Sequence, residues 1–374
     1  MSMVTLQQCI PIGVSIMKFK SPVAKVELPK RDVSAELIDA ALSCNIALEN
    51  LYAAEAVCAE ADLVMSNIKA ATESINRFGL KTANMSIFDE GGDLSRAIGL
   101  EALEIASLEA MAISDLDELK KSYTEGLEGL AKDALNAAIE GLVKMWKALV
   151  AWFKALLDKN EKYGQYIEAN MASLKDADIS KVQATVLNYA DAKKVAEGYK
   201  ACAELLKAVA AILPESIGNA DKADTAMGLA LDAPVKSAIA KLKDFGVTEG
   251  AEGITFGEFP FKEVEGKTLG ELGYDAAKAE AICKLAIAAI KDPSLKSLAH
   301  AIDKAYDASI KAYKAAGDDE AKQKAAAAKK KVCGQANAVV KFGSNMLRKI
   351  AFAGYTCCKA AKAPAKAEGE AEQK

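Results

Sequence analysis

The sequence predicts an all-α fold, an elongated bundle of long amphipathic helices. Hydrophobic residues make up 51% of the 374 residues, but many are alanine, which shares the highest helix propensities with leucine, lysine and glutamate. Only 8 prolines interrupt the chain, and apolar residues recur at spacings of three and four along most of it. Because aromatic residues amount to only 6%, we expect cores that are thin seams between helices.

An extended arm is expected at the N-terminus, followed by a long helix. Pro22 and Pro29 prevent a regular helix within residues 1–33. A helix is then predicted from Ala35 to Phe78, because apolar residues mark one buried stripe along it. Gly79 is predicted to end this helix.

A polar, glycine-containing loop is expected over residues 80–95, and a further helix over residues 94–111. At Ser114–Asp115 the chain offers a new N-cap, with acidic residues in the first turn where the helix dipole favours them. From there to Leu157 the helical pattern is the strongest in the chain.

This strongest helix carries large apolar residues at alternating spacings of four and three, the pattern of a coiled-coil or bundle seam. The seam consists of Leu135, Ile139, Leu142, Trp146, Leu149, Phe153 and Leu156. Lysines are expected on its flanks, namely Lys144, Lys147, Lys154 and Lys159. The spacing favours the core of a bundle; the alternative is a helix in which Val143–Leu157 lies in a membrane surface and Trp146 and Trp152 insert.

The rest of the chain is predicted to be helical apart from one insertion. Asp178 and Asp191 are expected to open helices, and Pro214 to close a helix over Val195–Leu213. Later helices are expected at Tyr274–Lys291, Leu295–Ala316 and Glu320–Phe352. Residues 245–273 are rich in glycine and aromatics, which predicts a loop or small hairpin with extended pieces at Ile254–Phe256 and Phe259–Phe261.

Five regions follow from these patterns. They are an acidic N-terminal arm with helices (1–109), a main helical bundle (110–244), the irregular or hairpin insertion (245–273), the C-terminal helices (274–358) and a disordered tail (359–374).

The sequence contains few residues that could carry catalysis. It has no phosphate-binding, dinucleotide-binding, zinc-hydrolase or nucleophile-elbow motif. The single histidine, His300, lies in a helical alanine run and is expected to be a core or cap residue. Eight cysteines are scattered without CxxC spacing, and most should behave as small hydrophobes; the Cys357–Cys358 pair lies in a basic context that we expect to be exposed. We therefore expect no enzyme activity, no cofactor and no metal.

Charge is distributed unevenly along the chain. Residues 1–109 carry 9 Lys and Arg against 15 Asp and Glu, whereas residues 321–367 carry eleven Lys and Arg and no acid. The basic stretch could bind a polyanion such as DNA without sequence specificity, or it could be a solvated helix face. The candidate contacts are Lys322, Lys324, Lys329, Lys330, Lys331, Arg348 and Lys349.

Three features occur together: the acidic N-terminal region, the junction EALEIASLEA at residues 101–110, and the following helix GLVKMWKALVAWFKALLDK. This arrangement resembles the internal head proteins of large tailed bacteriophages, which a prohead protease cuts after a glutamate in a Ser/Ala-x-Glu context. The resemblance implies a cleavage motif formed by Ser107, Leu108, Glu109 and Ala110, with the cut after Glu109. Ser34-Ala35-Glu36 is a second match.

The resemblance implies a structural protein that is made in the host cytoplasm as a precursor and retained in the capsid interior with packaged DNA. Its partners would be the DNA, the prohead protease and other capsid-interior proteins. Two alternatives stay open, a membrane-interacting amphipathic helical protein and a cytosolic helical scaffold whose seam recruits a partner helix.

Overall fold

The computed structural model describes residues 34–90, 113–220, 229, 231–250, 253–316 and 319–362. The all-α prediction is confirmed, because the strands within the described residues form a single two-stranded hairpin. The helical elements are α1 (Ser34–Glu90), α4 (Ile113–Asn170), η1 (Met171–Lys175), α5 (Tyr189–Asn219), α6 (Ala233–Lys241), η3 (Lys243–Phe245), α7 (Ala276–Lys291), α8 (Ser294–Ala316) and α9 (Glu320–Lys362). The described residues belong to one compact unit that starts at Val33.

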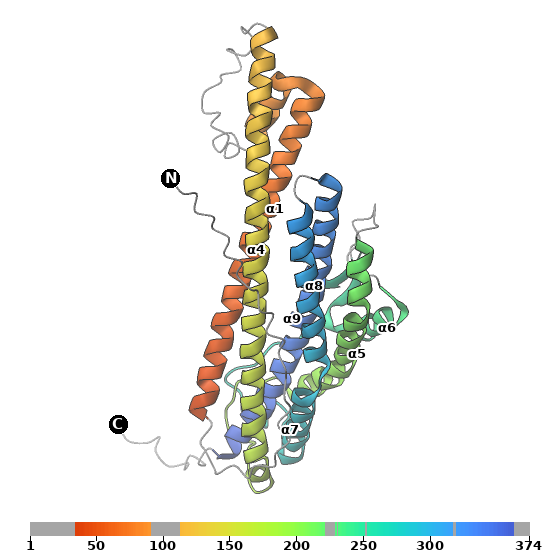
Figure 1. The fold of residues 1–374 in the computed structure, drawn as a ribbon. Coiled ribbons are helices and arrows are strands. Elements are labelled where there is room, and N and C mark those ends of the chain that lie inside the picture. The colour runs from red at the N-terminus through yellow and green to blue at the C-terminus, as the bar shows by residue number, and fades with distance from the viewer. Residues whose placement is uncertain are drawn as a thin grey trace, which may run out of the picture. The chain divides into compact units, whose positions relative to one another are not determined.

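Helices α1 and α4 lie side by side and run antiparallel (Figure 1). Lys162 near the end of α4 contacts Glu36 near the start of α1, whereas Gly141 earlier in α4 packs against Cys58 further along α1. The prediction that Gly79 ends the first helix is wrong, since α1 continues to Glu90. A glycine within a helix costs only about 1 kcal/mol, which the strong helix formers around it can offset.

The second long helix also exceeds its predicted bounds. Helix α4 starts at Ile113, before the predicted cap at Ser114–Asp115, and continues past Leu157 to Asn170. The extension follows from burial, because Tyr163, Tyr166 and Ile167 continue the apolar face in the last turns. Tyr163 and Tyr166 both make edge-to-face contacts with Tyr355 of α9.

Helix α5 does not end at Pro214 as predicted, but continues to Asn219. The proline ring removes one helical hydrogen bond, yet Leu213, Ser216 and Ile217 keep their side chains buried on both sides of it. Packing of these buried side chains against the core outweighs the hydrogen bond that is lost at Pro214.

Capping chemistry differs from prediction at three places. Asp191 does not open α5, which begins at Tyr189 with Asn188 as its N-cap. Asp178 opens no helix; its carboxylate accepts hydrogen bonds from the backbone N and side chain of Ser180, which makes a turn. Helix α6 was not predicted; its N-cap Asp232 accepts a hydrogen bond from the Val235 N at 3.0 Å. The start signal was present as an Asp-Ala-Pro run at residues 232–234.

The predicted insertion contains an antiparallel hairpin of β1 (Val247–Gly250) and β2 (Gly253–Phe256), in the register Val247↔Phe256 to Gly250↔Gly253. Gly246 precedes it with a left-handed φ of 79° that favours glycine. The extended piece predicted at Phe259–Phe261 is not a strand, because both rings pack against Phe245 instead.

Helices α7, α8 and α9 match their predicted starts within two residues. Helix α9 packs against α4, α5, α7 and α8, so it lies at the centre of the C-terminal helices. It continues beyond the predicted end at Phe352 because Cys357 and Cys358 are completely buried on its inner face. Four residues assigned to a disordered tail (359–362) therefore belong to α9, and residues 363–374 lie outside the described residues.

Candidate interaction site between α1, α4 and α9

The apolar seam of α4 lies in the core. Leu135, Leu142, Leu149 and Phe153 are buried, with Leu142 at 0% exposure, while Ile139 and Trp146 are half-buried against the same cluster. The seam is covered by α1 along much of its length and by the C-terminal helices elsewhere. It is therefore already occupied by this chain and is not open to recruit a partner helix.

The positions of the two tryptophans argue against a helix that inserts Trp146 and Trp152 into a membrane surface. Trp152 is only 3% exposed, and the Trp146 Nε1 donates a hydrogen bond to the Asp303 Oδ1 of α8 at 2.9 Å. Val143–Leu157 could not lie in a lipid surface without separating α4 from its neighbours. Among the described helices, none is both long and apolar enough to cross a bilayer.

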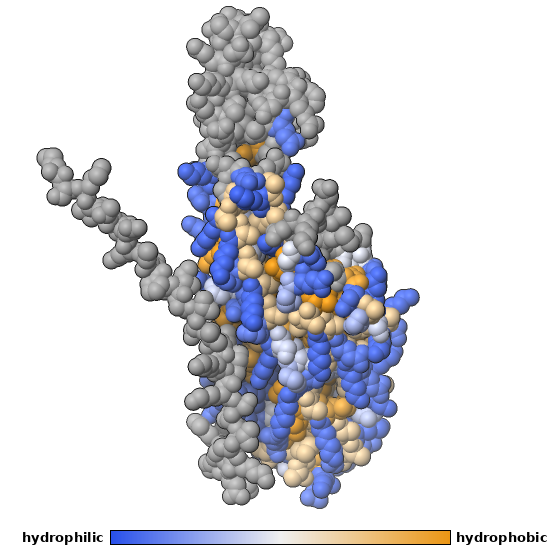
Figure 2. All heavy atoms as spheres, turned by 45° about the vertical axis from the view of Figure 1, so that its right-hand side comes forward, coloured by the Kyte–Doolittle hydropathy of each residue, from blue (hydrophilic) through white to orange (hydrophobic). Residues whose placement is uncertain are grey.

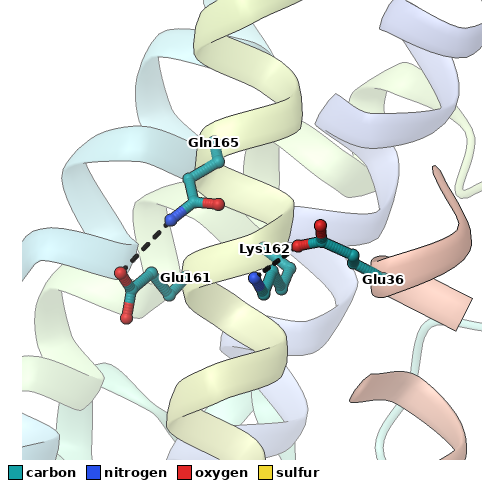
Figure 3. A network of polar contacts seen from close by, with 4 residues as sticks. All are labelled: Glu36, Glu161, Lys162 and Gln165. Carbon is teal, nitrogen blue, oxygen red and sulfur yellow. Dashed lines mark hydrogen bonds and ion pairs between the residues drawn. The ribbon is translucent and has the colours of Figure 1, made fainter. Parts of the chain in front are cut away.

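Acidic residues of α1 hold lysines of the two helices beside it. Lys162 of α4 donates to Glu36 at 2.7 Å, as Figure 3 shows. Lys341 of α9 pairs with Glu55 at 2.5 Å. Further along, Lys330 of α9 pairs with Asp62, also at 2.5 Å, and donates to the backbone oxygen of Cys58.

These ion pairs are partly shielded from water. The side chains of Lys330 and Lys341 are 15% and 23% exposed, and Lys341 also lies 4.5 Å from the centre of the Tyr52 ring. Glu55 accepts a second hydrogen bond from the Asn337 Nδ2 at 2.8 Å. The hydrogen bond to Glu36 raises the pKa of Lys162 on α4, which keeps that ammonium charged. Because water screens them less, the pairs on α9 are stronger than fully exposed ones.

Several of the other predicted DNA-contact cations are also paired within the chain. Arg348 and Lys349 both contact the Glu263 Oε1, at 3.1 and 3.5 Å, and Lys322 contacts Asp319 at 3.2 Å. Burial lowers the pKa of Lys349. The remaining members of the set lie on the same helix, namely Lys324, Lys329 and Lys331.

Lys159 departs from its predicted place on the flank of the seam. It is 6% exposed, its Nζ lies 5.9 Å from the centre of the Tyr163 ring, and burial lowers its pKa. The other flanking lysines, Lys144, Lys147 and Lys154, are exposed as predicted. Lys159 differs because it lies near Cys44 of α1, Arg348 of α9 and Glu263.

A groove of about 500 Å³ opens between the three helices and β2. Its floor is apolar and includes Trp152, Leu156 and Phe342, and its cations are Lys341 and Arg348. Both cations are held by carboxylates of this chain, so the groove offers an apolar floor with its charges already neutralised.

Within the described residues, no cluster of three or more His, Cys, Asp or Glu side chains could hold a metal ion. His300 is exposed and lies within α8, so it is neither the core nor the cap residue that was expected. Cys357 and Cys358 are buried, which corrects their expected exposure, and burial raises the pKa of Cys357. The Cys283 and Cys358 sulfurs lie 3.4 Å apart in this apolar interior.

The predicted cleavage motif, Ser107 to Ala110, lies outside the described residues, as do the arm at 1–33 and the helix at 94–111. The second Ser/Ala-x-Glu match lies at the start of α1, where Glu36 pairs with Lys162. The second match is therefore part of a helix that packs and forms an ion pair within the bundle.

Sequence reasoning missed an apolar surface on α1. Across the face drawn in Figure 2, hydrophilic side chains (blue) alternate with hydrophobic ones (tan to orange). Helix α1 carries large hydrophobic side chains that are 40–65% exposed. They are Ile38, Leu42, Ile46, Tyr52, Val57, Leu63 and Val64, and among the described residues all such exposed side chains belong to this helix.

No protein-family model matches the chain, and neither a curated protein nor a solved structure is significantly similar to it.

Proposed function

We propose that this chain is a structural protein of a bacteriophage virion interior, made as a precursor and cut near Glu109. In this proposal the N-terminal acidic segment keeps the basic part of the chain neutral until cleavage, and the retained part then lies against packaged DNA. The chain acts by packing and by charge, without catalysing a reaction.

One observation carries the proposal: three carboxylates of α1 neutralise three lysines that lie beyond the expected cleavage point. Glu36, Glu55 and Asp62 precede Glu109, whereas their partners Lys162, Lys330 and Lys341 follow it. A cut after Glu109 would leave α1 attached to α4 and α9 by noncovalent contacts alone. Release of α1 would free the lysines and uncover part of the apolar α4 seam, so cleavage would change both charge and packing.

The first test is the N-terminus and intact mass of the protein isolated from its natural source. Processing predicts a mature chain that begins at Ala110. A chain that retains α1 in mature particles would contradict the precursor part of the proposal.

The second test is DNA binding by the purified full chain and by a chain cut after residue 109 and freed of α1. We expect the full chain to bind weakly and the cut chain to bind more tightly, with affinity falling as salt rises. Each lysine that neutralises a phosphate adds about −0.9 to the slope of log affinity against log salt, so the three lysines should steepen it by about 3.

A double variant, Glu55→Gln with Asp62→Asn, should partly reproduce this gain without cleavage, since it removes two of the three carboxylates. Glu140→Gln is the matched control, because Glu140 is exposed on the neighbouring helix α4. Equal DNA binding by the full and cut chains would show that α1 does not mask the charge of the lysines. The location in the virion would then rest on the N-terminus of the mature chain alone.

The helical scaffold is a second candidate, supported by the exposed apolar side chains of α1. The scaffold would recruit its partner through this outer surface, because the α4 seam is already filled. It predicts a stable complex with another protein that is indifferent to DNA and to lipid vesicles, measurable by co-sedimentation.

A further inference from the structure

Helix α1 has two apolar faces, of which the bundle covers one. The inner face buries Leu37, Cys44, Leu51 and Cys58. On the opposite side Ile38, Leu42 and Ile46 recur every fourth residue, and Val57 and Val64 follow at intervals of 11 and 7, which return to the same face of a helix with 3.6 residues per turn. We call Ile38, Leu42, Ile46, Val57 and Val64 the outer face. An exposed apolar surface of this kind marks a site of association.

Within residues 34–68 of α1 itself, every charged side chain near the outer face is acidic. Residues 34–68 contain no lysine or arginine. The acids that point inward are used by the bundle, since Glu36, Glu55 and Asp62 pair with lysines. A second set, Asp39, Glu49 and Glu60, is exposed. Its spacing places Glu49 and Glu60 beside the outer-face residues, so any occupant meets apolar side chains bordered by carboxylates.

This charge pattern discriminates between occupants. A second copy of α1 packed on the outer face would bring like-charged carboxylates together along the contact, which is unfavourable. An anionic lipid surface would be repelled for the same reason. A helix with apolar residues on one side and lysines or arginines on its flanks satisfies both the apolar face and the carboxylates.

We propose that the outer face of α1 docks a basic amphipathic helix of another protein. Ile38 and Val64 are 26 residues apart, which corresponds to about 39 Å of helix, so a partner helix of about 25 residues covers the face. Apolar anchors of the partner pack between Ile38, Leu42 and Ile46 at one end and Val57 and Val64 at the other. The docking stands independently of virion processing, because it requires neither cleavage nor DNA.

The test uses the full chain and a synthetic, fluorescently labelled peptide of about 25 residues, with leucines on one helical face and lysines on its flanks. A control peptide has every lysine replaced by glutamate. We expect anisotropy titrations to give binding of the lysine peptide that is at least tenfold tighter than that of the glutamate peptide, and that weakens as salt rises.

Three variants locate the contact. Leu42→Ser with Ile46→Ser should weaken binding of the lysine peptide at least tenfold, and both positions are exposed, so the fold should persist. Glu49→Lys with Glu60→Lys should reverse the preference towards the glutamate peptide, a gain that an unfolded chain would not give. Glu140→Lys is a single charge reversal at an exposed position of α4 and should bind like the unchanged protein.

Equal binding of the two peptides would overturn the proposal, as would an equal loss in the Glu140→Lys variant. Sedimentation of the chain alone tests whether a second copy of this chain, and not a basic helix of another protein, occupies the outer face. If the protein forms dimers that Leu42→Ser with Ile46→Ser dissolves, the occupant is a second copy and the basic partner is excluded.

Discussion

Leu142 and Ile38 are aliphatic residues of the paired helices α4 and α1, and they differ in burial. Leu142 is 0% exposed and Ile38 is 65% exposed. Leu142→Ala should lower the free energy of unfolding by about 2–5 kcal/mol because it leaves a cavity in the seam. Ile38→Ala should change it by less than about 0.5 kcal/mol. Urea denaturation of the two variants checks this pair, and similar losses in both would mean that the outer face is covered.

Tyr163 gives a prediction for alkaline pH. Burial raises the pKa of its hydroxyl to about 12, against 10.0 for a free tyrosine. Below pH 10 the ring is neutral in both states and contributes no pH dependence. Above pH 10 the unfolded state ionises first, so the free energy of unfolding should fall as pH rises towards 12. Denaturation between pH 9 and 11.5 should show this fall, and Tyr163→Phe should make it shallower; an unchanged slope would refute the assignment.

At the scale of the element, α5 contains two glycines with opposite surroundings. A Cβ on Gly198 would lie 2.3 Å from the Phe245 ring, whereas one on Gly218 would meet nothing within 4 Å. Gly198 therefore allows η3 to pack closely on α5.

The corresponding alanine variants should shift stability in opposite directions. Gly198→Ala should destabilise the protein by about 1–3 kcal/mol through overpacking. Gly218→Ala should stabilise it by up to about 1 kcal/mol through helix propensity. Thermal and urea denaturation measure both. The second variant serves as the control for the first, since it replaces a glycine of the same helix without a steric clash. A stabilised Gly198→Ala protein would show that Phe245 moves away freely.

Across the whole molecule, the seven cysteines of the described residues are free and buried. Burial raises the pKa of Cys333 to about 12, and those of Cys44 and Cys58 are also raised. Little thiolate is present at neutral pH, and thiolate is the reactive form. These thiols should react with an aromatic disulfide reagent only as fast as the bundle opens, and rapidly in denaturant. More than one fast thiol in the native chain would contradict this expectation, since Cys9 alone lies outside the described residues.

Features that depend on residues close together in the sequence could be predicted, whereas features that depend on distant residues could not. The α4 seam at Leu142 and Phe153 could be predicted because its spacing of three and four is written in consecutive turns. Helix ends were predicted poorly at Gly79 and Pro214, where tertiary burial or flanking propensity overrides a local breaker. The outer face of α1 was missed because an apolar residue such as Ile38 is read as core unless the position of its neighbours is known.

Helical structure, the starts of most helices and the apolar face of α4 could all be predicted from local patterns, because these properties depend on residues within a few turns of one another. The pairing of acids with lysines and the open face of α1 depend instead on how distant helices pack. Glu36 and Lys162 are 126 positions apart, and Glu55 and Lys341 are 286 apart. Such pairs form only when antiparallel helices pack in a particular register, and no local pattern encodes that register.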